Sequence, residues 1–187
     1  MQTSRVIVLR RYRLTESSLV AELLAETHGK LRVVARGALR SGSAMAGCID
    51  LFQLCEARVT RSRRSSLHSL ADAVLIEPHA AIRGDYQRTL AAAYFCQLTA
   101  MVLPDESPSP EVFELLRKAL EYLARSAPVA AAVTRFESRL LAELGLGGDD
   151  GGPPHERLAE HAGALPRSRE RLLEALRDGA AAGSQSD

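Results

Sequence analysis

The first 77 residues alternate short apolar runs with polar or glycine-containing breaks, a pattern typical of β-strands. Strands are predicted over five ranges: 5–9, 19–26, 30–36, 49–60 and 67–76. The pair His28-Gly29 predicts a hairpin between the second and third strands, because glycine adopts positive φ without steric cost. Pro78 ends the last strand, since proline cannot continue a β-ladder.

The order of these strands favours a small barrel. The run over 19–26 contains helix-favouring Leu, Ala and Glu, but its neighbours favour a strand. The segment 37–47 holds three glycines and predicts a loop that crosses between the third and fourth strands. Hairpins plus one loop crossing fit a closed barrel, which removes most exposed strand edges. We therefore expect an N-terminal five-stranded OB-fold barrel.

Apolar residues beyond position 78 recur every three or four positions, as on one face of a helix. Three such stripes lie over 85–103, 110–127 and 129–144. Ser109 is a favourable N-cap, and Gly145 stands where a helix C-terminal glycine is expected. Pro104 and Pro128 end the first two helices. The predicted fold class is α+β, with a small α-helical domain after the barrel.

Composition divides the chain into four parts. We expect an OB-fold domain over 1–78, a helical core over 79–146, a linker over 147–154 and a weakly helical C-terminal segment over 155–187. The linker has the sequence G-G-D-D-G-G-P-P. In the last part a helix is expected after Pro166, followed by a disordered tail from Gly179.

Composition excludes several classes of protein. Of the 187 residues, 46% are hydrophobic and 25% charged, which is typical of globular proteins. The sequence contains no uncharged apolar run long enough to predict a membrane span, and its first residues lack the apolar core of a secretory signal. Three cysteines, an odd number, argue against a disulfide scaffold. We expect a cytoplasmic protein that makes no membrane contact.

Charge is distributed unevenly, although the net charge is only +1. Residues 1–76 hold 12 Lys and Arg against 6 Asp and Glu, whereas residues 77–187 hold 12 against 17. A basic half joined to an acidic half indicates a polyanion-binding part joined to a part with another use. Two surfaces that simply differ in charge would give the same numbers, so this alternative stays open.

Particular positions carry the basic charge. Lys30, Arg32 and Arg36 share one face of the third predicted strand, and Arg40 lies in the glycine-rich loop. Four more arginines crowd the tip between the last two strands: Arg58, Arg61, Arg63 and Arg64. These side chains could neutralise phosphates, or they could be ordinary solvated surface. Only Tyr12 and Phe52 offer aromatic rings for base stacking, so binding would depend mainly on phosphate contacts and on salt.

No catalytic or metal-binding constellation emerges. The cysteines Cys48, Cys55 and Cys96 lack zinc-ligand spacing and are interpreted as buried apolar residues. The five histidines form no known metal or catalytic pattern, and the serine-rich stretches lack a nucleophile motif. We therefore expect no catalytic residue, metal or cofactor, and no enzymatic activity.

Several segments, taken in order, resemble the bacterial recombination mediator family RecO. V-L-R-R-Y-R-L-T-E-S-S from Val8, H-G-K-L from His28 and V-A-R-G-A-L-R-S from Val34 are similar to the family's first hairpins. L-H-S-L-A-D-A from Leu67 is similar to its fifth strand, and F-E-S-R-L-L-A-E-L-G from Phe136 is similar to the helix that closes its core. The resemblance covers roughly residues 5–146.

The resemblance implies a role in DNA repair and recombination. RecO-type proteins bind single- and double-stranded DNA, anneal complementary strands, act with RecR, contact the single-strand-binding protein and help load RecA at gaps. In a bacterial cytoplasm this implies association with the nucleoid. DNA contacts are predicted at Lys30, Arg32, Arg36, Arg40, Arg10, Arg11, Arg61, Arg63 and Arg64.

One departure and two alternatives accompany the resemblance. Many members carry a four-cysteine zinc module after the helix that contains Phe136, whereas this chain has the glycine-rich linker there. We therefore expect no zinc, and the short C-terminus leaves binding of the single-strand-binding protein open. The alternatives are an RNA-binding OB-fold module and a non-nucleic-acid adapter that acts through its helical half.

Overall fold

A computed structural model describes the whole chain except residues 44, 46, 126–128, 149–151 and 184–187. The chain forms two compact units. The barrel unit contains Met1–His79 and Leu103–Arg117, and the helical unit contains Ala80–Val102 and Lys118–Asp187. The segment Leu103–Arg117 thus belongs with the barrel, although the sequence placed it in the helical core.

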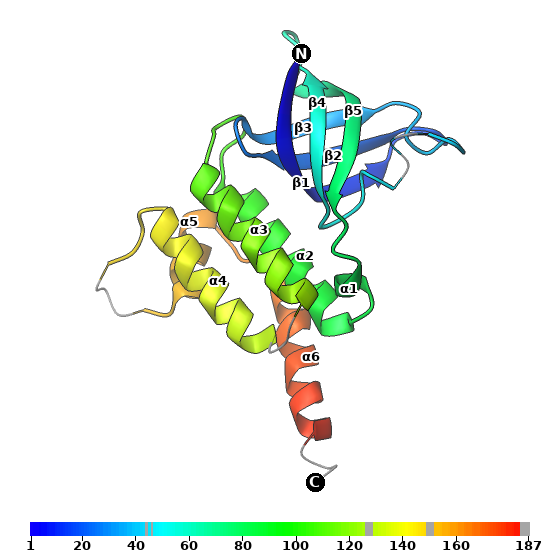
Figure 1. The fold of residues 1–187 in the computed structure, drawn as a ribbon. Helices are drawn as coiled ribbons and strands as arrows, with labels where there is room; N and C mark the ends of the chain where they lie inside the picture. Colours follow the sequence, from blue (N-terminus) through cyan, green and yellow to red (C-terminus); the bar gives the residue numbers. More distant parts are fainter. Residues whose placement is uncertain (44, 46, 126–128, 149–151, 184–187) are drawn as a thin grey trace. The chain divides into compact units, whose positions relative to one another are not determined.

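The barrel unit is built from five strands, shown in Figure 1. They are β1 (Gln2–Arg13), β2 (Leu19–Ala25), β3 (Gly29–Ala35), β4 (Leu54–Thr60) and β5 (Leu67–Glu77). They close in the order β1-β2-β3-β5-β4, and every neighbouring pair is antiparallel except β3 and β5. The predicted OB-fold barrel followed by helices is confirmed.

Alternate residues of the strands fill the barrel interior. On β2 and β3 every second residue points into the core, so that Leu23 and Val33 are fully buried. The long strand β1 pairs with β4 through its first half and with β2 through its second half. A register shift between Val8 and Arg10 lets β1 bend between these two partners.

Two strands differ from the prediction by more than one residue at an end. β1 extends on both sides of the predicted 5–9, because pairing with two neighbours stabilises its polar ends. β4 begins at Leu54 and not at Ile49, because Phe52 has φ of +69°, which lies outside the β region. The turn before β4 is held by the Leu51 amide, which donates to Asp50 Oδ1 at 2.8 Å.

A segment far along the chain docks onto the barrel. Asp105 pairs with Lys30 at the start of β3, and the Glu106 amide donates to the Lys30 carbonyl at 2.9 Å. Gly29 permits this approach: a Cβ there would lie 2.0 Å from the Ser107 carbonyl oxygen, and its φ is +70°. Only glycine tolerates both conditions.

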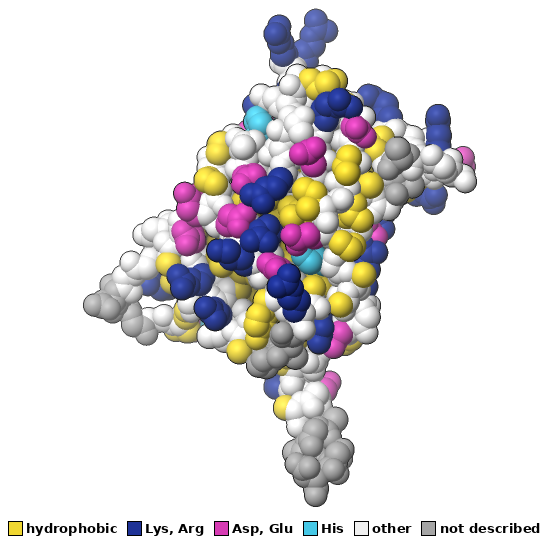
Figure 2. Space-filling view, viewed as in Figure 1, with side chains coloured by type: hydrophobic (Ala, Val, Ile, Leu, Met, Phe, Trp, Pro, Cys, Tyr) yellow, Lys and Arg dark blue, Asp and Glu magenta, His cyan; other side chains and the backbone are white. Residues whose placement is uncertain are grey.

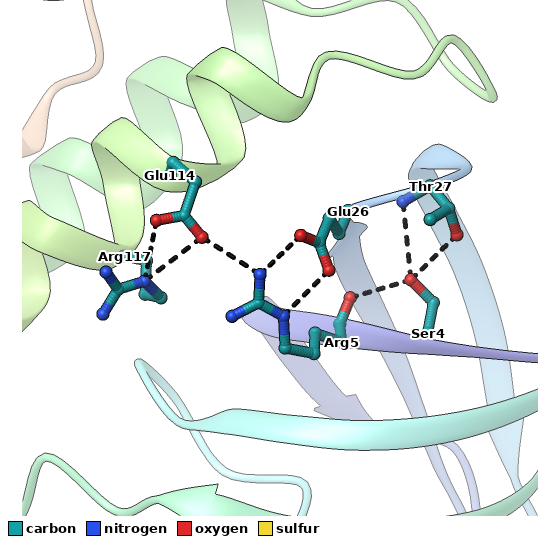
Figure 3. A network of polar contacts seen from close by, with 6 residues as sticks. All are labelled: Ser4, Arg5, Glu26, Thr27, Glu114 and Arg117. Atoms are coloured by element: carbon teal, nitrogen blue, oxygen red, sulfur yellow. Dashed lines mark hydrogen bonds and ion pairs between the residues drawn. The ribbon is translucent and has the colours of Figure 1, made fainter.

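The first turns of α3 (Pro110–Arg125) are held to β1 by Arg5, as Figure 3 shows. The Arg5 guanidinium donates to both carboxylate oxygens of Glu26 and, at 3.2 Å, to Glu114 Oε1. It also lies over the Phe113 ring, 5.5 Å from the ring centroid. This cluster explains why the beginning of α3 belongs to the barrel unit.

The helical unit is organised around α2 (Tyr86–Val102), which is preceded by the single turn α1 (Ala80–Arg83). α2 is buried on most of its circumference, since α4 (Val129–Glu143) and α6 (Ser168–Gly183) both pack against it. Phe95 of α2 stacks on Phe136 of α4 with ring centroids 4.1 Å apart. Gly145 has φ of +70° after α4, as predicted.

The C-terminal region is more ordered than the sequence suggested. It contains two helices, α5 (Pro154–Ala162) and α6, and α6 includes residues 179–183, where a disordered tail was expected. α6 buries Leu172 completely, and its Ala175 carbonyl accepts a hydrogen bond from Gln87 Nε2 of α2 at 2.8 Å. The remaining tail residues 184–187, the middle of the predicted linker and Pro128 lie outside the described residues.

No helix among the described residues is long and apolar enough to cross a membrane.

Candidate nucleic-acid interface

Basic side chains lie on the outer surface of β1 and β3, on either side of β2. The register places Arg10 beside Glu22 and Glu22 beside Arg32, on the side of the sheet opposite the core. Arg32 Nη2 donates to the Tyr12 hydroxyl at 3.1 Å, and Tyr12 is 49% exposed. This hydrogen bond raises the pKa of the Arg32 guanidinium, and it places the charged group beside an accessible aromatic ring.

Two further arginines continue this surface beyond the end of β3. Arg36 is exposed, and its Nη1 donates to Ser69 Oγ at 3.4 Å. Arg40 is exposed in the turn that follows, and its side chain folds back over Gly37. Within the described part of the chain neither guanidinium has a carboxylate partner. We call Arg10, Arg32, Arg36 and Arg40, together with Tyr12, the arginine face.

Lys30 lies on the same strand as Arg32, but its ammonium group is paired with carboxylates. Its Nζ is 3.1 Å from Asp105 Oδ1 and 3.9 Å from Glu22 Oε1, and its side chain is only 13% exposed. Two carboxylates neutralise the ammonium, so Lys30 holds the docked segment to β3. Arg11 is likewise paired, with Asp50 at 2.9 Å. The structure therefore does not bring Lys30 and Arg11 into the arginine face.

The turn between β4 and β5 carries the other predicted arginines. Figure 2 shows Lys or Arg side chains projecting from the barrel unit there. Arg61 forms an ion pair with Glu106, whereas Arg63 and Arg64 are exposed and have no carboxylate partner among the described residues. The turn thus presents two unneutralised cations and one that is held in place.

The base of this turn is fixed by a buried histidine. His68 is 2% exposed, and its Nδ1 accepts a hydrogen bond from the Ser62 amide at 3.2 Å. Its Nε2 lies 3.0 Å from Glu106 Oε1, an arrangement that suits a neutral ring with its proton on Nε2. Burial, and then the charge of Arg61, lower the pKa of His68.

This arrangement suits binding to phosphates and to stacked bases. Exposed guanidinium groups can neutralise a nucleic-acid backbone, and Tyr12 can stack on one base. In the described residues there is no group of three or more His, Cys, Asp and Glu side chains that could hold a metal. Cys55 and Cys96 are buried, as expected, whereas Cys48 is only partly buried. Burial raises the pKa of the Cys55 thiol to about 12.

The sequence did not predict the contacts of two residues of the candidate interface, Tyr12 and Glu106. Tyr12 was noted as an aromatic residue, but its partnership with Arg32 depends on the alternation of β1 beyond Leu9, and the predicted strand stopped there. Glu106 follows Pro104 in what was predicted to be an interhelical loop, with no local signal that it would contact the barrel.

Comparison with known proteins identifies the family. The models of the N-terminal and C-terminal regions of recombination protein O match residues 1–79 and 83–149. This chain belongs to the RecO family. It is 34% identical over 140 residues to the DNA repair protein RecO of Anaeromyxobacter sp. strain K, an alignment that covers 75% of this chain and 55% of that protein.

Other RecO relatives show the same extent of similarity. The DNA repair protein RecO of Idiomarina loihiensis is 33% identical over 150 residues, which are 78% of this chain and 61% of the relative. That of Geobacter metallireducens is 33% identical over 147 residues, which are 78% and 59%. The chain thus spans a little over half the length of the curated relatives it matches.

Proposed function

We propose that this chain acts in DNA repair and recombination as a non-enzymatic mediator that binds single- and double-stranded DNA through the arginine face. One observation carries the proposal: four exposed arginines lie on the outer sheet of an OB-fold barrel and in the turn that follows it, and one of them is hydrogen-bonded to an accessible tyrosine. Among the described residues, no carboxylate pairs with Arg36 or Arg40. OB-folds bind single strands by this combination of cations and aromatic rings. Arg63 and Arg64 extend the proposed contact.

The expected salt dependence follows from the number of contacts. Each phosphate neutralised on single-stranded DNA contributes about 0.7 to the slope of log affinity against log salt concentration. Four arginine contacts would give a slope of about −2.8. Between 50 and 200 mM salt, affinity should then fall about 50-fold.

The test is fluorescence anisotropy of labelled single-stranded DNA titrated with the chain at several salt concentrations. The variant R10Q/R32Q/R36Q/R40Q removes the cations of the arginine face and should reduce the slope by about 2.8, leaving the part contributed by Arg63 and Arg64. A matched control, R135Q/R139Q/R167Q/R171Q, removes four exposed arginines of the helical unit and should leave the slope unchanged. Equal effects of the two variants would refute the assignment of the arginine face.

The remaining parts of the proposal rest on family membership. We propose that the chain anneals complementary strands, acts with RecR, contacts the single-strand-binding protein and RecA, and lies near the nucleoid of a bacterial cytoplasm. Strand annealing is measured by the loss of donor emission when two labelled complementary strands pair. RecR binding is measured by co-sedimentation. Tighter binding of RNA than of DNA, or absence of binding to both at low salt, would favour an RNA-binding module or an adapter instead.

A further inference from the structure

The turn between β4 and β5, residues 61–66, is held by side chains. Among the described residues, no hydrogen bond between two backbone groups involves this turn. Instead, amides in and beside the turn donate to side chains of the same hairpin, in the pairs Ser62 with His68 Nδ1, Arg64 with Ser62 Oγ and Leu67 with Ser65 Oγ. A segment with few backbone hydrogen bonds opens easily, so the order of this turn depends on those side chains.

Glu106 anchors both sides of the turn. Its carboxylate forms an ion pair with Arg61, the first residue after β4, and its Oε1 lies 3.0 Å from Nε2 of His68 in β5. Because Nδ1 of His68 accepts from the Ser62 amide, the ring proton is on Nε2 and is donated to Glu106. One carboxylate thus holds the beginning and the end of the turn.

The segment that contains Glu106 docks onto the barrel through other groups. Asp105 pairs with Lys30, the Glu106 amide donates to the Lys30 carbonyl, and the Ser107 backbone packs closely against Gly29. Glu106 nevertheless has φ of +55°, a left-handed conformation that residues other than glycine seldom adopt. Backbone strain of this kind concentrates at functional sites. We therefore looked for the use of the Glu106 side chain in the turn that it contacts.

The turn lies beside the arginine face. In the parallel pairing of β3 with β5, Leu67 is opposite Arg32, so the turn ends next to the strand that carries Arg32. Arg63 and Arg64 are exposed, and within the described part of the chain neither has a carboxylate partner. The loop between the fourth and fifth strands is one of the loops by which OB-folds contact a bound oligonucleotide.

We propose that Glu106 is a positioning residue for nucleic-acid binding, which orders the turn in advance so that Arg63 and Arg64 meet the same single strand as the arginine face. The inference rests on the proposed function. A loop that is ordered before binding loses less conformational entropy on binding, so the same contacts give a higher affinity. By its charge alone, a carboxylate near the strand would repel phosphate. Positioning and charge therefore predict opposite effects when this carboxylate is removed.

The variant E106Q tests the sign of the effect. Its amide oxygen can still accept from His68, but the ion pair with Arg61 is lost. In anisotropy titrations of single-stranded DNA with the full chain at about 0.15 M salt, binding should weaken about threefold, although a negative charge has been removed. The salt slope should stay within about 0.3 of the wild-type value, because no cation is lost. The control E56Q removes an exposed carboxylate in the middle of β4 and should not weaken binding.

A double-variant comparison shows whether Glu106 acts through the turn. R63Q/R64Q should lower the magnitude of the salt slope by about 1.4, the contribution of two phosphate contacts. In that background E106Q should cause no further loss of affinity, because the turn then has no free cation to position. A loss of the same size in both backgrounds would show that Glu106 acts elsewhere, and would overturn the proposal.

A variant without any change of charge provides an independent test. S62A/S65A removes the hydroxyl groups that accept the Arg64 and Leu67 amides and leaves the Glu106 contacts in place. It should weaken binding about twofold, again only when Arg63 and Arg64 are present. Amide hydrogen exchange over residues 61–67 should become faster in S62A/S65A and in E106Q. Both serines lie outside the barrel core, so S62A/S65A decides the question if E106Q fails to fold.

The outcomes separate this inference from the proposed function. Absence of DNA binding by the wild type would reject the proposed function and the inference together. If the wild type binds but R63Q/R64Q leaves its slope unchanged, the turn makes no contact and only the inference fails. Tighter binding by E106Q with a slope steeper by about 0.7 would mean that the released Arg61 simply joins the contact, which would also overturn the positioning role.

Discussion

A buried ion pair in the helical unit offers a stringent test of the structure. Arg169, at the beginning of α6, donates from Nε to Glu137 Oε1 of α4 at 2.9 Å, and Tyr94 of α2 donates its hydroxyl to the same oxygen at 2.7 Å. Glu137 is 4% exposed and Tyr94 is fully buried. Burial tends to lower the pKa of Arg169, but the hydrogen bond and charge of Glu137 outweigh it and raise that pKa. Three helices therefore meet at one carboxylate.

The substitution R169M keeps the aliphatic bulk of the side chain but leaves Glu137 as a buried carboxylate without its cation. Removing one partner of a buried pair costs about 3–5 kcal/mol. Because Arg169 is 15% exposed, we expect the lower end, about 3 kcal/mol. The double variant E137Q/R169M removes both charges while the amide oxygen still accepts from Tyr94. It should regain about 2 kcal/mol of that loss.

Urea unfolding measures these changes. The chain has no tryptophan, so the transition is followed by far-ultraviolet circular dichroism, which reports mainly the helices. With a slope of about 2 kcal/mol per molar urea, R169M should lower the midpoint by about 1.5 M. A midpoint within about 0.3 M of the wild type, or a double variant no more stable than R169M, would refute the account of the triad.

Three further predictions concern the barrel unit. G29A should destabilise the chain by more than about 2 kcal/mol in urea unfolding, because its Cβ would meet the Ser107 carbonyl. G42A, whose φ is also positive but whose surroundings are open, should cost only about 1 kcal/mol, and equal costs would contradict the close approach of Ser107 to Gly29. Burial lowers the pKa of His68 below 6.5, so as the pH falls the unfolded state binds a proton at His68 before the folded state does, and stability should fall below about pH 6.5. H68Q should lose this part of the pH dependence of stability, and an NMR titration midpoint of His68 above 6.5 would argue against this account. R5M should lower stability by about 1 kcal/mol, a modest value because the guanidinium is 40% exposed, and this loss should shrink in an E26Q background; additive losses would indicate that the two residues do not interact.

The architecture of the barrel was predictable because local signals agreed. Alternation of buried positions identified β3, and the hairpin at Gly29 made a strand of Leu19–Ala25 despite its helix-favouring composition. The start of β4 was not predictable, since the positive φ of Phe52 depends on the turn built around Asp50 and not on its own residue type. Local pattern therefore predicted element types better than their ends.

The sequence alone could not tell which of the predicted cations are exposed and which are paired with a carboxylate. Arg32, Arg36 and Arg40 lie where the strand face and loop suggested. Lys30 was indistinguishable from them by sequence, because its carboxylate partner Asp105 is 75 positions away. An ion pair across such a separation has no periodic signature. Likewise, the helix α6 was underestimated because its stability comes from packing on α2 and not from a strong apolar stripe of its own.

The docking of Asp105 and Glu106 onto the barrel has a consequence for the order of folding. Lys30 of β3 and Arg61 after β4 are synthesised long before Asp105 and Glu106, the carboxylates with which they pair. All of α2 is synthesised in between. Until then Lys30 lacks Asp105, and both Arg61 and His68 lack Glu106. A nascent barrel that ends near His79 is therefore an incomplete and less stable intermediate. The last step in completing the N-terminal barrel therefore waits for the chain to pass through part of the next unit and return.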